Sequence, residues 1–223
     1  MERKIAGTRP LADLGDLPRP DSPSFEAGTH FFPIPPESMD SLSQWTDKER
    51  LNPSAVMLAA FEILIYHQAN HEHFLLGFPV DGRCGAASKN AMGFFSEPMI
   101  VRANMHPWLT LREVIELAQK EIKQGIRWRH TPFAVAAEVI EHHHGRTNSP
   151  ALQLLFSHIL LPALDDPRCR VRLRRIHEGF GKINLDLWLT VQSVDERIMG
   201  RLFRPGHGDG RGALSTDPPT TIE

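Results

Sequence analysis

One segment constrains the fold more than any other: residues 55–66, where almost every residue except Glu62 is apolar. Asn52 is a favourable N-cap residue, and Pro53 takes the first helical position, where its missing N–H costs nothing. The segment is therefore expected to form a helix. Because a helix that is apolar on all sides belongs inside a core, the rest of the chain has to surround it.

Periodicity elsewhere predicts both strands and further helices. Strands are expected where short apolar runs or alternating patterns occur, at residues 25–34, 74–80, 99–102, 152–161, 183–191 and 197–203. Further helices are expected at residues 38–50 with Ser38 as cap, at 111–122 after a capping box from Thr110 to Glu113, and from Thr131 to a frayed end at His144. The expected inward residues of the last two are Leu111, Val114, Ile115, Ala118 and Ile122, then Phe133, Ala136, Val139 and Ile140. This order predicts an α/β fold, a two-layer sandwich with a mixed β-sheet.

Composition divides the chain into three parts. Residues 1–24 are rich in proline and are expected to form an extended leader that is not a packed element. Residues 25–203 form the predicted folded unit. Residues 204–223 hold almost nothing apolar, which predicts a disordered tail.

Charge and hydropathy exclude several classes of partner. The net charge is -2, which gives no electrostatic reason to expect nucleic acid as a partner. The longest apolar stretches are too short for a membrane span, and the first ten residues lack the apolar segment of a secretory signal. A cytoplasmic location without membrane association is therefore expected.

Two groups of histidines are candidates for metal or catalytic sites. His67 and His71 are four residues apart at a helix end, with His73 just beyond, but no third ligand with a suitable spacing supports a metal site. The run His142–His144 cannot converge on one ion from a helix, because consecutive helical residues point about 100° apart. Both groups are expected to be surface histidines, and no metal site is predicted.

A series of short motifs resembles the condensation domains of nonribosomal peptide synthetases, over about residues 10–203. In chain order the matching blocks are Leu17–Pro20 with Gly28–Phe31, Pro53–Phe61, Leu76–Arg83, Met92–Glu97, His130–Phe133, Ser149–Gln153 and Lys182–Leu185. They resemble the family's second-lobe linker, first buried helix, "G-x-P-x-x-G-R", "I-G-x-F-V-N-T", "H-Q-D-x-P-F-E", "S-R-x-P-L-F-Q" and "K-F-D-L" blocks.

The resemblance implies a half domain of chloramphenicol-acetyltransferase-like fold. Condensation domains have two such lobes with a tunnel between them, and they form peptide (amide) bonds between carrier-bound acyl or peptidyl and aminoacyl thioesters. The catalytic "H-H-x-x-x-D-G" motif lies on the first lobe, whereas the blocks above belong to the second. The chain is therefore expected to be a C-terminal lobe without catalytic residues and inactive alone, so that its status as an enzyme stays open.

By the same resemblance, eight residues are assigned to the tunnel or the lobe contact: Gly93, Phe94, Phe95, Ser96, Glu97, Pro132, Phe133 and Ser149. The implied partners are an N-terminal condensation lobe, peptidyl carrier proteins and an adenylation domain. No cofactor is expected to bind directly; phosphopantetheine arms would arrive on the carrier proteins.

The chain also departs from the family pattern. Glu97 stands in place of an Asn, Trp128–His130 replace "H-Q-D", and Asn184 replaces an Asp. The family's "Y-x-T-D-L-F-D" ending does not follow Phe203, which suggests a truncated or frameshifted reading frame. Two alternatives therefore stand beside the lobe hypothesis: a non-catalytic module that binds carrier proteins or neighbouring synthetase domains, and a degenerate gene fragment.

Overall fold

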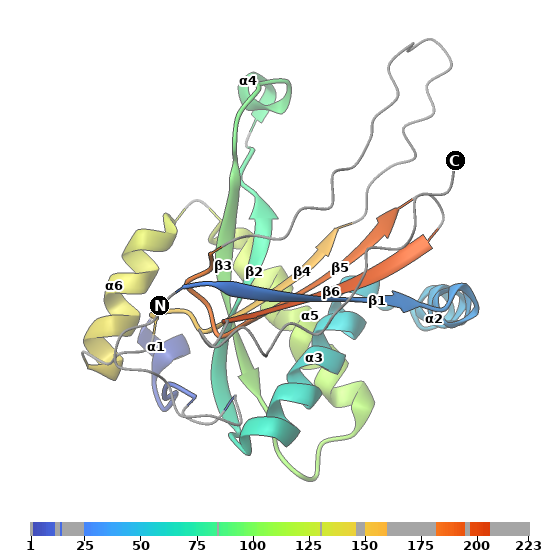
Figure 1. The fold of residues 1–223 in the computed structure, drawn as a ribbon, viewed down its shortest axis with the longest axis horizontal. Helices are drawn as coiled ribbons and strands as arrows, with labels where there is room; N and C mark the ends of the chain where they lie inside the picture. The colour runs from blue at the N-terminus through green and yellow to red at the C-terminus, as the bar shows by residue number, and fades with distance from the viewer. Residues whose placement is uncertain are drawn as a thin grey trace.

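A six-stranded mixed sheet organises the molecule (Figure 1). The computed structural model describes residues 2–11, 14, 25–83, 85–129, 131–145, 150–159, 182–194 and 197–205. The strands are β1 (Ala27–Ile34), β2 (His73–Asp81), β3 (Ser96–Asn104), β4 (Leu154–Ile159), β5 (Leu187–Val194) and β6 (Arg197–Pro205), in the sheet order β1-β6-β5-β4-β2-β3. β4 is parallel to both its neighbours, β2 and β5, and the other pairs are antiparallel. The predicted α/β fold with a mixed sheet is confirmed.

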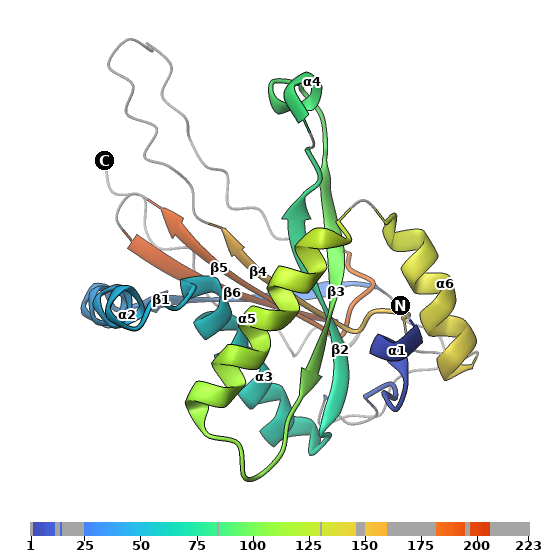
Figure 2. The same cartoon turned by 180° about the vertical axis from the view of Figure 1, so that it is seen from behind.

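The helices form one main layer and one smaller one. They are α1 (Glu2–Ile5), α2 (Pro36–Glu49), α3 (Pro53–Ala69), α4 (Gly85–Lys89), α5 (Leu111–Arg127) and α6 (Phe133–His144). α3 and α5 cover one face of the sheet, while α1 and α6 lie at the β2–β3 end beyond the other face (Figure 2). No helix in the described part of the chain has the length and apolarity needed to cross a membrane.

α3 is the buried helix that its composition predicts. The Asn52 side chain accepts a hydrogen bond from the Ser54 N–H at 2.9 Å, and Pro53 is the first helical residue. Leu58, Phe61 and Ile65 are fully buried in the main core, where the Phe61 ring stacks on Phe156 of β4. Burial of side chains of this size stabilises the fold by about 1.5–3 kcal/mol each relative to exposure.

The predicted extended leader is wrong for the described residues 2–11. Residues 2–5 form α1, and the Ile5 side chain is fully buried with Ile100 and Ile140 in a second core cluster. The Leu11 backbone is paired on both sides by the Gln153 amide, which accepts from the Leu11 N–H at 2.7 Å and donates to its carbonyl at 2.8 Å. Residues 2–11 pack because Ile5 and Leu11 are buried in the two core clusters, which proline content alone did not indicate.

α5 and α6 follow their predicted patterns with one exception. The capping box of α5 forms as predicted, with the Thr110 side chain accepting from the Glu113 N–H and the Glu113 carboxylate accepting from the Thr110 N–H. The predicted inward residues are buried or partly buried, except Leu111, which is exposed because it lies in the first turn, before the helix reaches the sheet.

Several predicted boundaries differ from the structure, among them those of β3, β4, β5 and the end of α5. α2 begins at Pro36 without a side-chain cap, and not after a Ser38 cap. β1 begins at Ala27, two residues after the predicted start, and ends at Ile34 as predicted; Pro33 fits within it because an edge strand tolerates a residue without an N–H. The loop predicted after Asp81 contains α4. β6 runs to Pro205 and so includes the first two residues of the predicted tail; residues 206–223 lie outside the described part of the chain.

Candidate functional site

The β2–β3 connection is the part of the fold where most of the predicted site residues lie. β2 and β3 form a long antiparallel hairpin that extends beyond the rest of the sheet and carries α4 at its tip (Figure 1). Near the tip Pro79 lies opposite Pro98, and Asp81 lies opposite Ser96. The hairpin therefore presents residues 82–95 away from the core.

Arg83 holds this connection in one shape. Its guanidinium donates to the carbonyl oxygens of Ala91 and Gly93 at 3.3 and 3.2 Å, and it stacks over the Phe95 ring with 4.4 Å from Cζ to the ring centroid. It also donates to the Asp81 carboxylate at 3.2 Å, and hydrogen bonds from the Arg83 backbone and side chain hold the pKa of Asp81 below its ordinary value. One side chain thus ties both arms of the connection together.

Gly82 and Gly93 are required by this arrangement. The Gly82 N–H donates to the Phe95 carbonyl at 2.8 Å, and a Cβ at Gly82 would lie only 2.7 Å from that same oxygen. Gly93 has a φ of 152°, where side chains are disfavoured, and a Cβ there would press on the Phe95 ring at 3.1 Å. The "G-x-P-x-x-G-R" and Met92–Glu97 blocks therefore meet in space as one unit.

Two large apolar side chains project from this unit into solvent. Met92 is 100% exposed and Phe94 is 91% exposed. Phe95 is half-buried beneath Arg83, and Ser96 and Glu97 form the start of β3, with the Glu97 side chain exposed. Exposed apolar side chains that lie close together are candidates for a contact surface. We call Met92 and Phe94 the apolar tip.

The other predicted site residues lie elsewhere. Pro132 is the exposed N-cap residue of α6, while Phe133 is partly buried against the second core cluster that contains Ile5 and Ile140. Phe133 thus anchors the start of α6 to the second core cluster. Ser149 lies outside the described residues.

The histidines have surroundings that spacing did not predict. His67 and His71 do not come together with a third ligand in the described part of the chain, whereas His73 lies beside Glu72 and His106. Of His142–His144, only His144 is partly buried: it is hydrogen-bonded to the Thr8 hydroxyl at 3.0 Å, and burial lowers its pKa, with a further fall caused by His143.

One serine–histidine pair was not found from the sequence. The Ser54 hydroxyl and His158 Nδ1 are 2.9 Å apart, joining the first turn of α3 to β4, and burial lowers the pKa of His158. In the tautomer that leaves Nδ1 without a proton, the imidazole accepts a hydrogen bond from the Ser54 hydroxyl, which is the start of a nucleophile–base arrangement. Within the described residues the His158 ring makes no other hydrogen bond, so no third group orients it as catalysis requires. No sequence signal joins residues that are 104 positions apart.

Comparisons with known proteins agree on one family. A family model described as "Condensation domain" matches residues 2–162. One of the linear gramicidin synthase proteins of Brevibacillus parabrevis is 24% identical over 193 residues, which are 86% of this chain and 2% of that protein. Phosphinothricin tripeptide synthetase PhsC of Streptomyces viridochromogenes is 22% identical over 154 residues, covering 69% of this chain and 14% of that protein. The chain thus spans a small part of the curated relatives that it matches.

Solved structures share the fold. The condensation domain of the monacolin K polyketide synthase MokA superposes with a TM-score of 0.71 at 16% identity, over 88% of this chain and 47% of that domain. The X-domain from teicoplanin biosynthesis, solved in complex with OxyB, gives a TM-score of 0.69 at 20% identity, over 92% of this chain and 46% of the other. The predicted chloramphenicol-acetyltransferase-like fold is consistent with these neighbours. With a family match over more than two thirds of its residues, the chain belongs to the condensation-domain family of the nonribosomal peptide synthetases.

Proposed function

We propose that this chain supplies the C-terminal lobe of a condensation domain that forms amide bonds in nonribosomal peptide synthesis. The observation that carries the proposal is the extent of the structural match: nearly all of this chain superposes on about half of a solved condensation domain, 88% against 47%. The motif blocks that match belong to the second lobe by resemblance, and no "H-H-x-x-x-D-G" occurs within the 223 residues.

In this proposal the catalytic histidine comes from the N-terminal lobe. The amine of a carrier-bound aminoacyl thioester attacks the carbonyl carbon of an upstream acyl or peptidyl thioester, the C–S bond breaks, and the amine proton leaves with the released phosphopantetheine thiol. A positioned imidazole contributes on the order of 10²–10⁴-fold to such a step. This chain contributes one wall of the tunnel through which the two arms approach each other.

The apolar tip is the proposed contact with the N-terminal lobe. Met92 and Phe94 are the two most exposed large apolar residues of the described chain, and both project from the connection that Arg83 fixes. Burial of two such side chains in a lobe interface would contribute about 1.5–3 kcal/mol each. Gly93, Phe95, Ser96 and Glu97 are proposed to shape the tunnel floor beside them.

Reconstitution tests this proposal. The chain is co-expressed with the N-terminal lobe of a related condensation domain, and formation of the amide between two loaded carrier proteins is followed by mass spectrometry. Product is expected only when both lobes are present, and Phe94→Ser is expected to weaken lobe association at least tenfold. Leu111→Ser, which removes an exposed apolar residue from α5, serves as the matched control. Product formed by the N-terminal lobe alone at an equal rate would overturn the proposal.

A second candidate is a docking module without catalysis. The solved complex of an X-domain with OxyB is a structure of the same fold in which the binding of another protein is the subject. In this alternative the chain binds a carrier protein with micromolar affinity, corresponding to about 8 kcal/mol, without needing an N-terminal lobe. Titration of carrier protein with and without its phosphopantetheine arm distinguishes the two functions. A docking module is expected to bind both forms of the carrier protein in the absence of an N-terminal lobe. Absence of carrier binding by the isolated chain excludes it.

A further inference from the structure

Three potential metal ligands meet at the end of the β2–β3 hairpin opposite the apolar tip. α3 ends at Ala69, and Asn70 takes the left-handed conformation, with φ of 51°, that turns the chain toward β2. Glu72 and His73 follow at the start of β2, while His106 lies just after β3. The Met105 N–H donates to the Glu72 carbonyl at 2.7 Å, and this backbone bond holds the two segments together.

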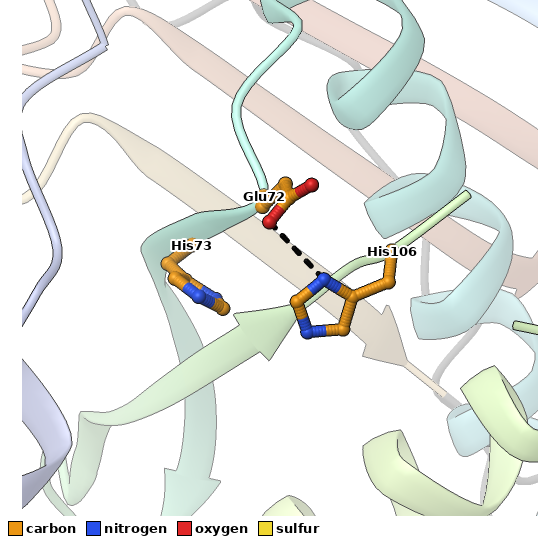
Figure 3. Close-up of side chains that lie close together, drawn as sticks. All are labelled: Glu72, His73 and His106. Atoms are coloured by element: carbon orange, nitrogen blue, oxygen red, sulfur yellow. Dashed lines mark hydrogen bonds and ion pairs between the residues drawn. The ribbon is translucent and has the colours of Figure 1, made fainter. Parts of the chain in front are cut away.

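The three side chains converge from these two segments (Figure 3). His106 Nδ1 is 3.1 Å from a Glu72 carboxylate oxygen, and the His73 and His106 rings are 5.4 Å apart in an edge-to-face arrangement. One ligand atom from each of the three residues lies within 4.8 Å of the others. The arrangement gathers two imidazoles and one carboxylate on one side of the hairpin.

His73 carries the clearest sign that a ligand is expected. Its Nδ1 atom is buried and has no hydrogen-bond partner in the described structure. A buried polar nitrogen without a partner costs about 1–3 kcal/mol, because its hydration is lost and nothing replaces it. A metal ion bonded to an imidazole nitrogen of His73 would give this ring the polar partner that the protein does not supply.

We propose that Glu72, His73 and His106 form a binding site for a divalent transition-metal ion, with zinc as the best fit. Zinc prefers imidazole and carboxylate ligands at about 2.0–2.2 Å, so neighbouring ligand atoms of a tetrahedral site lie roughly 3.3–3.5 Å apart. The His106–Glu72 distance of 3.1 Å is already close to that value, and the ligand atoms of all three residues lie within 4.8 Å of one another, so that small side-chain rotations suffice to bring them to one ion. Three protein ligands leave the fourth position for water.

The bound ion would join the beginning of β2 to the residue stretch after β3. β2 is nine residues long, which places the site about 25 Å from the apolar tip at the strand rise of about 3.3 Å per residue. The site is therefore separate from the proposed lobe contact, and it does not depend on the proposed function. An ion that binds only the folded chain stabilises it by mass action.

Zinc binding by the full 223-residue chain, without a polyhistidine tag, tests the proposal. Equilibrium dialysis is expected to give one zinc per chain, and cobalt(II) in place of zinc is expected to give the intense visible absorption of a tetrahedral site. His106→Ala is expected to weaken binding by more than about 100-fold, since loss of a direct ligand exceeds the roughly 10–100-fold cost of losing a supporting residue. Glu72→Gln, at a side chain that is 47% exposed, removes the carboxylate with little risk to folding.

Two controls separate this site from other histidines. His67→Ala and His142→Ala remove exposed histidines outside the cluster, and both are expected to leave the affinity unchanged. Absence of zinc binding by the chain would overturn the proposal. So would binding that is unaffected by Glu72→Gln and His106→Ala but lost in either control.

Fluorescence locates the ion independently of affinity. The His106 ring is stacked on Trp108, with centroids 4.7 Å apart and planes at 3°. Copper(II) at His106 is therefore expected to quench Trp108, and Trp108→Phe is expected to remove most of the quenching while one ion still binds. Equal quenching in the chain and in Trp108→Phe would contradict placement of the ion at His106.

Discussion

At the residue scale, Arg83 has the most specific role in the candidate site. It donates to two carbonyl oxygens of the connection and covers the Phe95 ring, so its removal frees both arms. Hydrogen bonds from a charged group contribute about 1.5–3 kcal/mol. We expect Arg83→Ala to raise amide hydrogen exchange in residues 91–95 about tenfold or more, with the exchange of α3 unchanged.

Arg83→Lys is the matched variant for this test. Lysine keeps the charge but lacks the planar fork that reaches two carbonyls, so intermediate exchange is expected. If Arg83→Ala leaves residues 91–95 as protected as before, the connection is held by the backbone bond from Gly82 to Phe95 and not by the guanidinium.

Glu62 is expected to make the free energy of unfolding depend on pH. Burial raises the pKa of its carboxyl well above the ordinary value of 4.5, the Glu121 carboxylate adds to the rise, and Oε1 has no hydrogen-bond partner in the described structure. Glu121 itself is paired with Lys4 at 2.8 Å. In the folded chain Glu62 therefore keeps its proton at pH values where the unfolded chain has lost it.

Stability is accordingly expected to fall as pH rises from about 4.5 toward the raised pKa of Glu62, by up to about 1.4 kcal/mol per pH unit. Urea unfolding from about pH 4.5 to about pH 8 measures this slope. Glu62→Gln is expected to flatten it, whereas Glu116→Gln, an exposed position on α5, is expected to leave it unchanged. Equal slopes in the wild-type chain and Glu62→Gln would show that other groups set the pH dependence.

At the element scale, the β1–β6 pair depends on a glycine. Gly200 lies opposite Phe32, and a Cβ at Gly200 would lie 2.1 Å from the Phe32 ring. Gly200→Ala is therefore expected to lower the free energy of unfolding by about 1–3 kcal/mol, since a rigid ring has to move. The double variant Gly200→Ala with Phe32→Leu is expected to recover part of this loss in urea unfolding. A loss in Gly200→Ala that Phe32→Leu does not reduce would place its cause outside the ring contact.

Individual elements were predicted where local chemistry determines them. The Asn52 cap and the capping box at Thr110 depend on residues close in sequence, and both formed as expected, whereas the strand predicted at residues 183–191 lies at Leu187–Val194. α1 was missed, because it depends on a distant partner: its residue Ile5 packs with Ile140 of α6. Local sequence propensity gives no information about such distant contacts.

The candidate sites also depend on contacts between residues that are distant in sequence. The motif blocks grouped Gly93–Glu97 as site residues, which stays a prediction, and the exposure of Met92 followed only from the structure. Spacing along the chain groups His73 with His67 and His71, whereas its neighbours Glu72 and His106 come together through the β2–β3 register. Clusters built by strand pairing cannot be read from spacing along one helix.

At the scale of the whole molecule, the apolar tip is expected to dominate the binding of hydrophobic dyes. Met92→Ser with Phe94→Ser is expected to remove most of the dye fluorescence, and to change the free energy of unfolding by less than about 0.5 kcal/mol, because both side chains are solvated. Leu111→Ser with Trp128→Ser is the control, since it removes two exposed apolar residues from α5 and its end. An equal loss of dye binding in the control would mean that no single patch is responsible.

The pairing of β1 with β6 also determines when the sheet can be completed during translation. β1 has its only described ladder with the last strand of the fold, Ala27 opposite Pro205, so a nascent chain holds β1 without its partner until residues 197–205 leave the ribosome. At about 5–20 residues per second, that interval is on the order of ten to thirty seconds. During this time the core around α3 can already assemble. The sheet is completed only when β6 pairs with β1.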